Sequence, residues 1–299
     1  MDVLRRALEL SPPDATTLQA WWEATQVERA RWSTTIERAV IGGALADRLA
    51  FAFATGYHEA LQQLVPGLQG NRASLCATEE GGAHPRAIQT TLTRVDDHLE
   101  LTGKKTWSTA ADKADVLLVI ASTGERDGKN QLVMVSVRAG AQGVTLTPSS
   151  APFVPEIPHA SVILDRVVVR DADVHGGDGY DTYLKPFRTI EDLHVHGALL
   201  GYLLGSARRR GWGELVPQIA IALTATRALA AEDSRSEATH LALAGLIEQT
   251  RRLVDPIEER WRGESDDEFT RWQRDRPLLK VATAARTARL ARAKQVLGL

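Results

Sequence analysis

The chain has 299 residues, which is enough for one large domain or two to three smaller ones with a sizeable hydrophobic core. Its 43% hydrophobic and 25% charged residues are typical of a globular protein and exclude disordered and low-complexity classes. Because 36 lysines and arginines nearly balance 38 aspartates and glutamates, the net charge of −2 provides no general attraction to nucleic acid or to an anionic membrane.

The cysteine content and the N-terminus narrow the class further. A single cysteine, Cys76, excludes an internal disulfide and a cysteine-rich zinc site, so no metal is expected. The first ten residues carry charges inside a short apolar stretch, unlike a signal peptide, and no run of about 18 apolar residues follows. We therefore expect a soluble cytoplasmic protein of bacterial type, with neither a membrane nor nucleic acid as partner.

The first part of the chain has the periodicity of helices. Between residues 35 and 64 apolar side chains recur every three or four positions and form one stripe, which predicts an amphipathic helix. The pattern ends at Val65, Pro66 and Gly67, a cluster of residues that break helices.

Between residues 73 and 170 the pattern changes to short β-branched or alternating runs separated by turn residues. Strands are expected at His98–Gly103, Asp115–Ser122, Gln131–Val137, Gly143–Pro148 and Ala160–Val169. Five or more strands at this spacing are typical of a small β-sandwich or barrel.

Helical periodicity returns after the glycine-rich segment that starts at Gly176. Helices are expected at Leu193–Arg209, Ile219–Ala231, His240–Trp261 and Arg276–Val296. Pro256 leaves open whether the third of these is one kinked helix or two. The order of helices, strands and helices favours segregated layers over an alternating parallel sheet.

The whole pattern predicts a multi-domain α and β fold. We expect a shortened helical N-terminal domain at residues 1–70, a middle β domain of sandwich or barrel type at 71–175, and a C-terminal helical bundle at 176–299.

Two stretches of the middle region carry the clearest signal of function. One is Leu75-Cys-Ala-Thr-Glu-Glu-Gly-Gly-Ala-His84, and the other is Leu101-Thr-Gly-Lys-Lys-Thr-Trp-Ser-Thr109. They are followed by Ala114-Asp-Val-Leu-Leu-Val and by Val162-Ile-Leu-Asp-Arg-Val-Val-Val169. In this order and spacing they resemble the middle domain of the acyl-CoA dehydrogenase family, and a weaker resemblance extends from about Val40 to the C-terminus.

The resemblance implies the acyl-CoA dehydrogenase fold, with FAD bound against the middle β domain. The residues that it assigns to the cofactor are Thr78, Gly81, Trp107, Ser108 and Thr109. Their chemistry is compatible with this assignment. Glycines let backbone N–H groups approach a ring edge, threonine hydroxyls can bond flavin nitrogens and carbonyls, and a tryptophan offers a flat face.

Each of these residues also has a purely structural explanation. Thr78 and Thr109 would suit ordinary strands, and Trp107 would suit a hydrophobic core. His84 stands where the family usually has a small polar residue, which predicts a differently shaped loop. Cys76 has no neighbouring base and is expected to be a small buried hydrophobe.

Two features of the family are not recognised in the sequence. The last segment, which carries the catalytic glutamate in many members, is expected to be missing, and the arginine and glutamine pattern that grips the FAD pyrophosphate is not found between residues 211 and 240. Some members place the glutamate on the first helix of the C-terminal domain. Glu191 is then the candidate base if Gly201 matches the family's helix glycine, but not if Gly205 does. Alternatively, Glu191 and Asp192 stabilise a helix N-terminus through its dipole.

Other charged residues are further candidates. His194 and His196 could act as general bases, since imidazole titrates near neutrality, or they could be structural. The last predicted helix carries Lys280, Arg286, Arg289, Arg292 and Lys294. This basic surface is interpreted as a solvated face, with contact to a cofactor diphosphate or a partner subunit as the alternative.

The resemblance implies an FAD-dependent oxidoreductase acting on CH–CH groups, in which a base takes the α-proton and FAD takes the β-hydride of an acyl thioester such as acyl-CoA. Family members of this kind are homodimers or tetramers. The alternative is a non-catalytic or repurposed subunit or binding protein that keeps the fold, has lost the base and FAD, and works with a second subunit. A flavin monooxygenase on the same fold is the third hypothesis.

Overall fold

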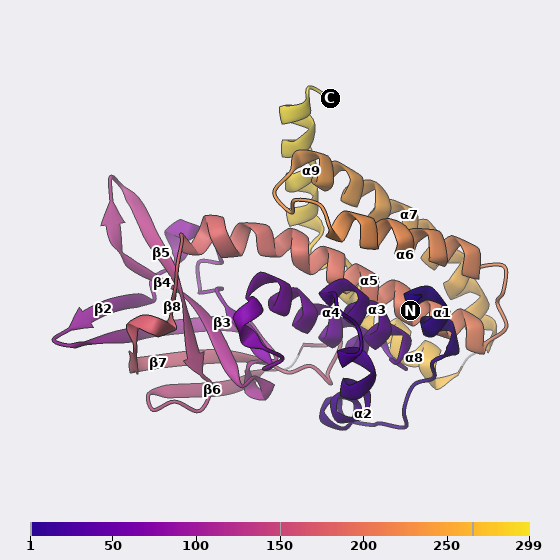
Figure 1. Ribbon diagram of the computed structural model, residues 1–299, viewed down its shortest axis with the longest axis horizontal. Coiled ribbons are helices and arrows are strands. Elements are labelled where there is room, and N and C mark those ends of the chain that lie inside the picture. Colours follow the sequence, from indigo (N-terminus) through magenta and orange to yellow (C-terminus); the bar gives the residue numbers. More distant parts are fainter. Residues whose placement is uncertain (1, 150, 265) are drawn as a thin grey trace. The chain divides into compact units, whose positions relative to one another are not determined.

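The computed structural model describes residues 2–149, 151–264 and 266–299, and contacts divide the chain into two units (Figure 1). The helical unit comprises Met1–Gln63, Pro152–Glu156 and Thr189–Leu299, and the β unit comprises Leu64–Ala151 and Ile157–Arg188. The first and last parts of the chain therefore belong to the same compact unit. The expected order of helices, strands and helices is confirmed.

The helical unit is built from helices at both ends of the chain. Those of the first part are α1 (Val3–Glu9), α2 (Leu18–Ala30), α3 (Thr35–Ala44) and α4 (Leu49–Leu64). Those of the last part are α5 (Lys185–Arg209), α6 (Val216–Ala230), α7 (Glu237–Glu264), α8 (Asp267–Asp275) and α9 (Thr283–Leu297), with a 3-10 turn at Arg276–Lys280. Among the helices of the described residues, none combines the length and the apolar character needed to cross a bilayer.

Small residues let α3 and α5 pack at very short distance. A Cβ atom on Gly43 would lie 2.0 Å from the carbonyl oxygen of Ala198, and one on Gly201 would lie 2.2 Å from that of Val40. No side chain fits at either position unless the backbones separate. The two glycines therefore join the first and last parts of the chain into one core.

The β unit contains one mixed sheet. Its strands are β1 (Ala73–Cys76), β2 (Thr91–Val95), β3 (His98–Thr109), β4 (Val116–Arg126), β5 (Lys129–Arg138), β6 (Val144–Ser149), β7 (His159–Val169) and β8 (Val174–His175). The strand order is β6-β7-β3-β2-β4-β5-β8, and β1 pairs with β4 in parallel. β7 pairs antiparallel with β3 and β6, and β5 pairs antiparallel with β4 and β8.

The sheet curls so that its two halves share one hydrophobic core. Buried side chains of β3 and β7, such as Leu101 and Val162, belong to the same cluster as Val119 of β4 and Val135 of β5. Strands that alternate inward and outward residues must close on one another to bury such a common face. This arrangement confirms the expected β-sandwich or barrel.

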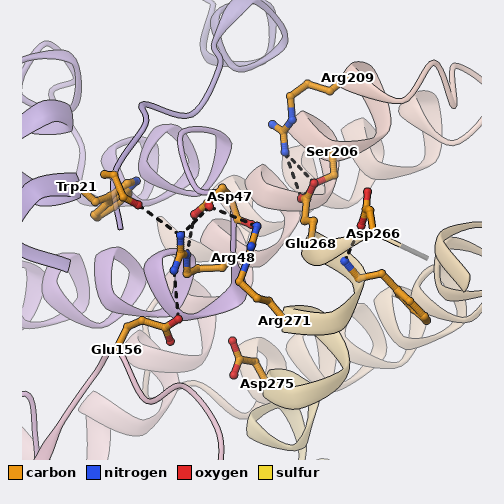
Figure 2. A network of polar contacts seen from close by, with 12 residues as sticks. Trp21, Asp47, Arg48, Glu156, Ser206, Arg209, Asp266, Glu268, Arg271 and Asp275 are labelled. Atoms are coloured by element: carbon orange, nitrogen blue, oxygen red, sulfur yellow. Dashed lines mark hydrogen bonds and ion pairs between the residues drawn. The ribbon is translucent and has the colours of Figure 1, made fainter. Parts of the chain in front are cut away.

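A network of arginines and carboxylates lies inside the helical unit (Figure 2). Arg48, at the start of α4, donates to Glu156 at 3.2 Å, and Arg274 of α8 donates to the same carboxylate at 2.9 Å. The fully buried carboxylate of Asp275 accepts the backbone N–H of Val154 at 2.8 Å. These contacts tie the segment between β6 and β7 to the helices.

The expected single helix at residues 35–64 is wrong, because the structure breaks it between Ala44 and Leu49. The indole N–H of Trp21 donates to the carbonyl oxygen of Leu45 at 3.0 Å, which satisfies an acceptor that the helix end leaves free. Each of the two helices buries apolar residues along its length. The apolar periodicity of residues 35–64 is therefore shared between two helices.

Other elements also differ from expectation. The third predicted helix is one helix, α7, which continues through Pro256. The helix expected from Leu193 starts at Lys185, after a π-helical turn at Gly179–Leu184. The last predicted helix consists of a 3-10 turn followed by α9. α8, β1, β2 and β8 were not expected, because each is too short to show a clear period.

Candidate functional site

The segment that follows β1 pairs with the end of β3, and this pairing places Thr78 opposite Trp107. The carbonyl oxygen of Thr78 accepts the backbone N–H of Thr106 at 2.9 Å. Trp107 packs on His159 of β7 with the ring centres 4.2 Å apart, yet 44% of the tryptophan remains exposed. The sheet thus presents an open aromatic surface beside a threonine, which suits a flat ligand.

The alternation of β3 separates two of the predicted cofactor residues. Trp107 is exposed and Thr109 is half-buried, whereas Ser108 is fully buried. Successive residues of a strand face opposite sides, so Thr109 shares the face of Trp107 and Ser108 faces the core. The Ser108 hydroxyl has no hydrogen-bond partner among the described residues. On the face of β3 that carries Trp107, Ser108 can therefore contact a ligand only through its backbone.

Gly81 lies at the tip of a tight turn. Glu79 and Gly82 exchange two backbone hydrogen bonds, of 3.0 and 2.8 Å, so that Glu80 and Gly81 form the turn between them. Gly82 has a φ of +96°, a conformation that favours glycine. The turn keeps Gly81 exposed within three residues of Thr78.

A buried ion pair connects the same two segments. The Lys105 ammonium donates to Glu79 Oε1 at 2.6 Å and to the carbonyl oxygen of Ile120 at 2.6 Å, and Lys105 is fully buried. Glu79 also accepts the Thr90 hydroxyl at 2.7 Å and the Gln89 backbone N–H at 2.8 Å. Both charged groups therefore have several partners.

The electrostatics of this pair follow from burial and contact. Burial lowers the pKa of Lys105, and contact with Glu79 offsets part of that effect. Burial acts to raise the pKa of Glu79, but the hydrogen bond and charge of Lys105 outweigh it and hold this pKa below its usual value. Glu79 is thus a carboxylate at neutral pH. Sequence reasoning missed the pair: both residues lie within the quoted motifs, but 26 positions apart, and nothing local signals the contact.

Comparison with known proteins identifies the family. Residues 74–167 match the acyl-CoA dehydrogenase middle domain, a span that contains both motifs, the ion pair and Trp107. These residues form a middle domain of the acyl-CoA dehydrogenase family.

A curated relative matches part of the chain. The chain is 31% identical over 136 residues to benzylmalonyl-CoA dehydrogenase of Aromatoleum aromaticum, a match that covers 44% of this chain and 34% of the relative. The matched region thus spans about a third of the length of that curated relative.

Solved structures extend the likeness over most of the chain. Butyryl-CoA dehydrogenase from Megasphaera elsdenii superposes with a TM-score of 0.70 at 16% identity, covering 89% of this chain and 82% of that one. The prolyl acyl carrier protein oxidase AnaB gives 0.71 at 16%, covering 99% and 97%. FMN-bound TdsC from Paenibacillus sp. A11-2 gives 0.72 at 17%, covering 97% and 92%. The expected acyl-CoA dehydrogenase fold is confirmed.

Glu191 belongs to a different unit from the other predicted site residues. Glu191 is half-buried on α5 in the helical unit, whereas the five predicted cofactor residues belong to the β unit. Because α5 begins at Lys185, Glu191 and Asp192 lie beyond its first turn and outside the range of the helix dipole. The dipole explanation for these two residues is wrong.

Asp192 instead binds the basic last helix. Its buried carboxylate accepts Arg286 Nε at 2.9 Å and also binds Arg289, both from α9. Arg289 further donates to the Thr189 hydroxyl at 3.3 Å. Two arginines of the expected solvated face are therefore links between α5 and α9.

The two histidines of α5 are buried links between helices. His194 bonds the carbonyl oxygen of Ile190 at 2.8 Å and the Thr35 hydroxyl at 2.9 Å. His196 bonds the Thr250 hydroxyl at 2.9 Å. Burial lowers the pKa of each imidazole to about 4. Both rings are enclosed and, with their low pKa values, are weak bases, which supports their structural interpretation over a role as general base.

Cys76 is a buried, inert thiol, as expected. Its side chain is fully enclosed and lies 3.6 Å from the carbonyl oxygen of Ser74. Burial raises the pKa of the thiol, so the reactive thiolate is scarce at neutral pH. Among the described residues, no three histidine, cysteine, aspartate or glutamate side chains gather in a way that could hold a metal.

The residues on the open face of β3 fit a flavin. The exposed ring of Trp107 offers a stacking surface. Within the described part of the chain, Thr78 and Thr109 bond through their backbone carbonyls and not through their hydroxyls. Two free hydroxyls, a flat aromatic face and an exposed glycine turn are groups that can bond the polar atoms of an isoalloxazine ring and stack on its face.

Proposed function

We propose that the protein is a flavin-dependent oxidoreductase that binds FAD against the end of β3 and acts on an acyl thioester such as acyl-CoA. The observation that carries this proposal is the exposed face of Trp107 with the free hydroxyls of Thr78 and Thr109 beside it. These are positions that the family resemblance assigns to the cofactor. FAD, when bound, supplies two-electron redox chemistry, and the protein supplies orientation and electrostatics.

Each residue of this surface has a distinct role in the proposal. Trp107 stacks beside the ring, and the hydroxyls of Thr78 and Thr109 bond its polar edge. The turn at Gly81 lets backbone N–H groups approach closely. Ser108 contributes its backbone, since its side chain is buried on the other face of β3.

Glu191 is our candidate for the catalytic base. In the proposal its carboxylate takes the α-proton of the thioester and holds it on one carboxylate oxygen. Glu191→Gln is expected to abolish dye-coupled oxidation of acyl-CoA substrates without loss of bound flavin. The exposed Glu259→Gln on α7 is the control and should keep full turnover. Retained turnover in Glu191→Gln would remove this residue from the mechanism.

The cofactor proposal is tested by titrating the purified protein with FAD and, in parallel, with FMN. Loss of an aromatic stacking partner typically removes 1–3 kcal/mol, so Trp107→Ala is expected to weaken flavin binding about tenfold or more. The control is Val168→Ala on β7, at a side chain that is 62% exposed. If the wild-type chain binds neither flavin, the proposal is overturned in favour of a non-catalytic relative.

Activity assays with different substrates distinguish two enzyme classes. The fold-level likeness to FMN-bound TdsC makes a flavin monooxygenase the second candidate. Reduction of a dye by acyl thioesters, attached to CoA or to a carrier protein, supports the dehydrogenase. Activity only with reduced flavin and oxygen would replace it with the monooxygenase.

We further propose that the protein works in the cytoplasm as a homodimer or tetramer. Light scattering of the purified chain checks the assembly, and a monomer at micromolar concentration would contradict it.

A further inference from the structure

We propose that Glu79 and Lys105 are positioning residues for the cofactor surface: their buried ion pair fixes residues 77–90 against β3 so that Thr78 and Gly81 stand beside Trp107. This inference rests on the proposed flavin function and adds to it the side chains that assemble the site.

The ion pair acts together with a neighbouring backbone contact. Thr78 accepts a backbone hydrogen bond of 2.9 Å from Thr106. Glu79 follows Thr78 in the chain, and it accepts a hydrogen bond of 2.6 Å from Lys105, which precedes Thr106. Two consecutive residues on one segment are thus held by two consecutive residues of β3. This double attachment leaves Thr78 little freedom relative to Trp107.

The same carboxylate also holds the far end of the segment. Glu79 Oε1 accepts the Thr90 hydroxyl at 2.7 Å and the Thr90 N–H at 3.1 Å, and Oε2 accepts the Gln89 N–H at 2.8 Å. The turn that presents Gly81 lies between these attachment points. One buried group therefore closes both ends of the loop.

A glycine in β3 makes room for this arrangement. A Cβ atom on Gly103 would lie 2.4 Å from the Thr90 hydroxyl oxygen and 2.6 Å from the Thr90 Cα. Only glycine lets Thr90 approach β3 this closely and still reach Glu79. Gly103, the glycine of the second motif, is therefore explained by the close approach of the loop and not by a contact with the flavin.

The chemistry of the pair favours positioning over simple stability. Apolar residues of similar volume often replace a buried ion pair without loss of stability, whereas removal of one partner leaves an uncompensated charge. Apolar side chains would not accept the N–H groups of Gln89 and Thr90. The charged pair therefore holds the loop in one conformation, whereas apolar side chains at these two positions would not.

The test measures the Kd for FAD by calorimetry in Glu79→Gln, in Lys105→Met and in the double variant. The control is Leu164→Ala, a core change in β7 that lowers the stability of the β unit and leaves Glu79, Lys105 and Thr90 in place. We expect Glu79→Gln to weaken FAD binding about tenfold, with the Kd of Leu164→Ala unchanged at a comparable loss in melting temperature.

The double variant separates stability from positioning. Removing both partners abolishes the unpaired buried charge, so the melting temperature should recover towards that of the wild type. Flavin affinity should stay low, because a glutamine has a single acceptor oxygen for the donors of Gln89 and Thr90. Recovery of affinity together with stability would overturn the inference.

A second readout does not require flavin. Hydrogen exchange in the flavin-free protein should show faster exchange of the Gln89 and Thr90 amides in Glu79→Gln, with the β7 amides unaffected. If Glu79→Gln does not fold, Thr90→Val removes one donor and should give the same effects at smaller size.

The possible failures are distinguishable. A wild-type chain that binds no flavin overturns the proposed function, while the exchange data still test the anchoring of the loop. A wild-type chain that binds FAD, with Glu79→Gln or Thr90→Val no weaker than Leu164→Ala, overturns the positioning role.

Discussion

The two units bury ionisable side chains in different settings. In the helical unit, groups such as His194, Asp192 and Asp275 bond helices or connecting segments to one another. In the β unit, the Glu79–Lys105 pair connects two segments that also carry the exposed Trp107. Burial of charge alone therefore does not mark a functional site. Its position beside an open, flat surface is the feature on which the proposed site rests.

This difference implies different consequences of mutation. Changes at the helix contacts should lower the free energy of unfolding and leave flavin affinity unaltered. Changes at the Glu79–Lys105 pair should lower flavin affinity beyond what the loss of stability explains.

The largest effect is expected from Gly43→Ala. The new Cβ would lie 2.0 Å from the Ala198 carbonyl oxygen, so α3 and α5 must separate, at a cost of about 3 kcal/mol in unfolding free energy. Urea denaturation followed by far-UV circular dichroism measures the loss. Gly245→Ala on α7 is the control: a Cβ there meets no atom within 4 Å, so better helix propensity should stabilise the protein by about 1 kcal/mol. Equal stability of Gly43→Ala and wild type would show that the helices can separate freely.

The second prediction concerns acid. The buried His194 and His196 have pKa values of about 4, below the 6.5 of a free imidazole, so the unfolded chain binds more protons between these values. Their contribution is complete above pH 6.5 and is lost as the pH falls towards 4. From pH 7.5 to pH 5, each ring should cost about 2 kcal/mol of stability.

His196→Gln tests this sign. Glutamine can still bond the Thr250 hydroxyl but does not titrate, so the variant should lose less stability than the wild type between pH 7.5 and pH 5. Denaturant melts at the two pH values provide the measurement. An identical loss in both proteins would mean that His196 is protonated without penalty in the folded state.

Asp192→Asn should have a somewhat smaller effect. It removes the charge that binds Arg286 and Arg289, whose side chains are 26% and 16% exposed. We expect a loss of about 1–2 kcal/mol, less than for a fully buried pair, because water reaches both guanidinium groups. Glu248→Gln, in an exposed cluster on α7, should cause no measurable change. A drop in flavin affinity in Asp192→Asn beyond its loss of stability would break the contrast between the units.

What could be predicted from the sequence follows the range of the interactions. Strand alternation and helix periodicity are local, so five strands and most helices were expected correctly, although their ends shifted. The positions of Thr78 and Trp107 were recognisable because each lies in a short motif. The sequence does not show that these two residues face each other across one backbone pairing, because that pairing forms only in the folded chain.

The parts that sequence reasoning missed depend on distant contacts. The break between α3 and α4 is stabilised by Trp21, which lies 24 positions before the carbonyl that it caps. Asp192 meets Arg286 across 94 positions, a distance at which spacing carries no signal. The contact between Glu79 and Lys105 spans 26 positions and is not signalled locally for the same reason, although each residue lies within a motif.

The smallest expected effect is at Cys76, and it shows how far the influence of the ion pair reaches. The thiol is fully buried on β1, and burial raises its pKa, so the native protein should not react with a thiol reagent at pH 8 until it unfolds. Cys76 lies three residues before Glu79 on the same segment. If the pair positions only the loop that follows, Glu79→Gln should leave the labelling rate of Cys76 at the wild-type value while loop amides exchange faster. Faster labelling in Glu79→Gln would show that the pair also holds β1 in the sheet. The contrast between a site-positioning pair and structural helix links would then need to be redrawn, because part of the pair's effect would be on the stability of the β unit itself.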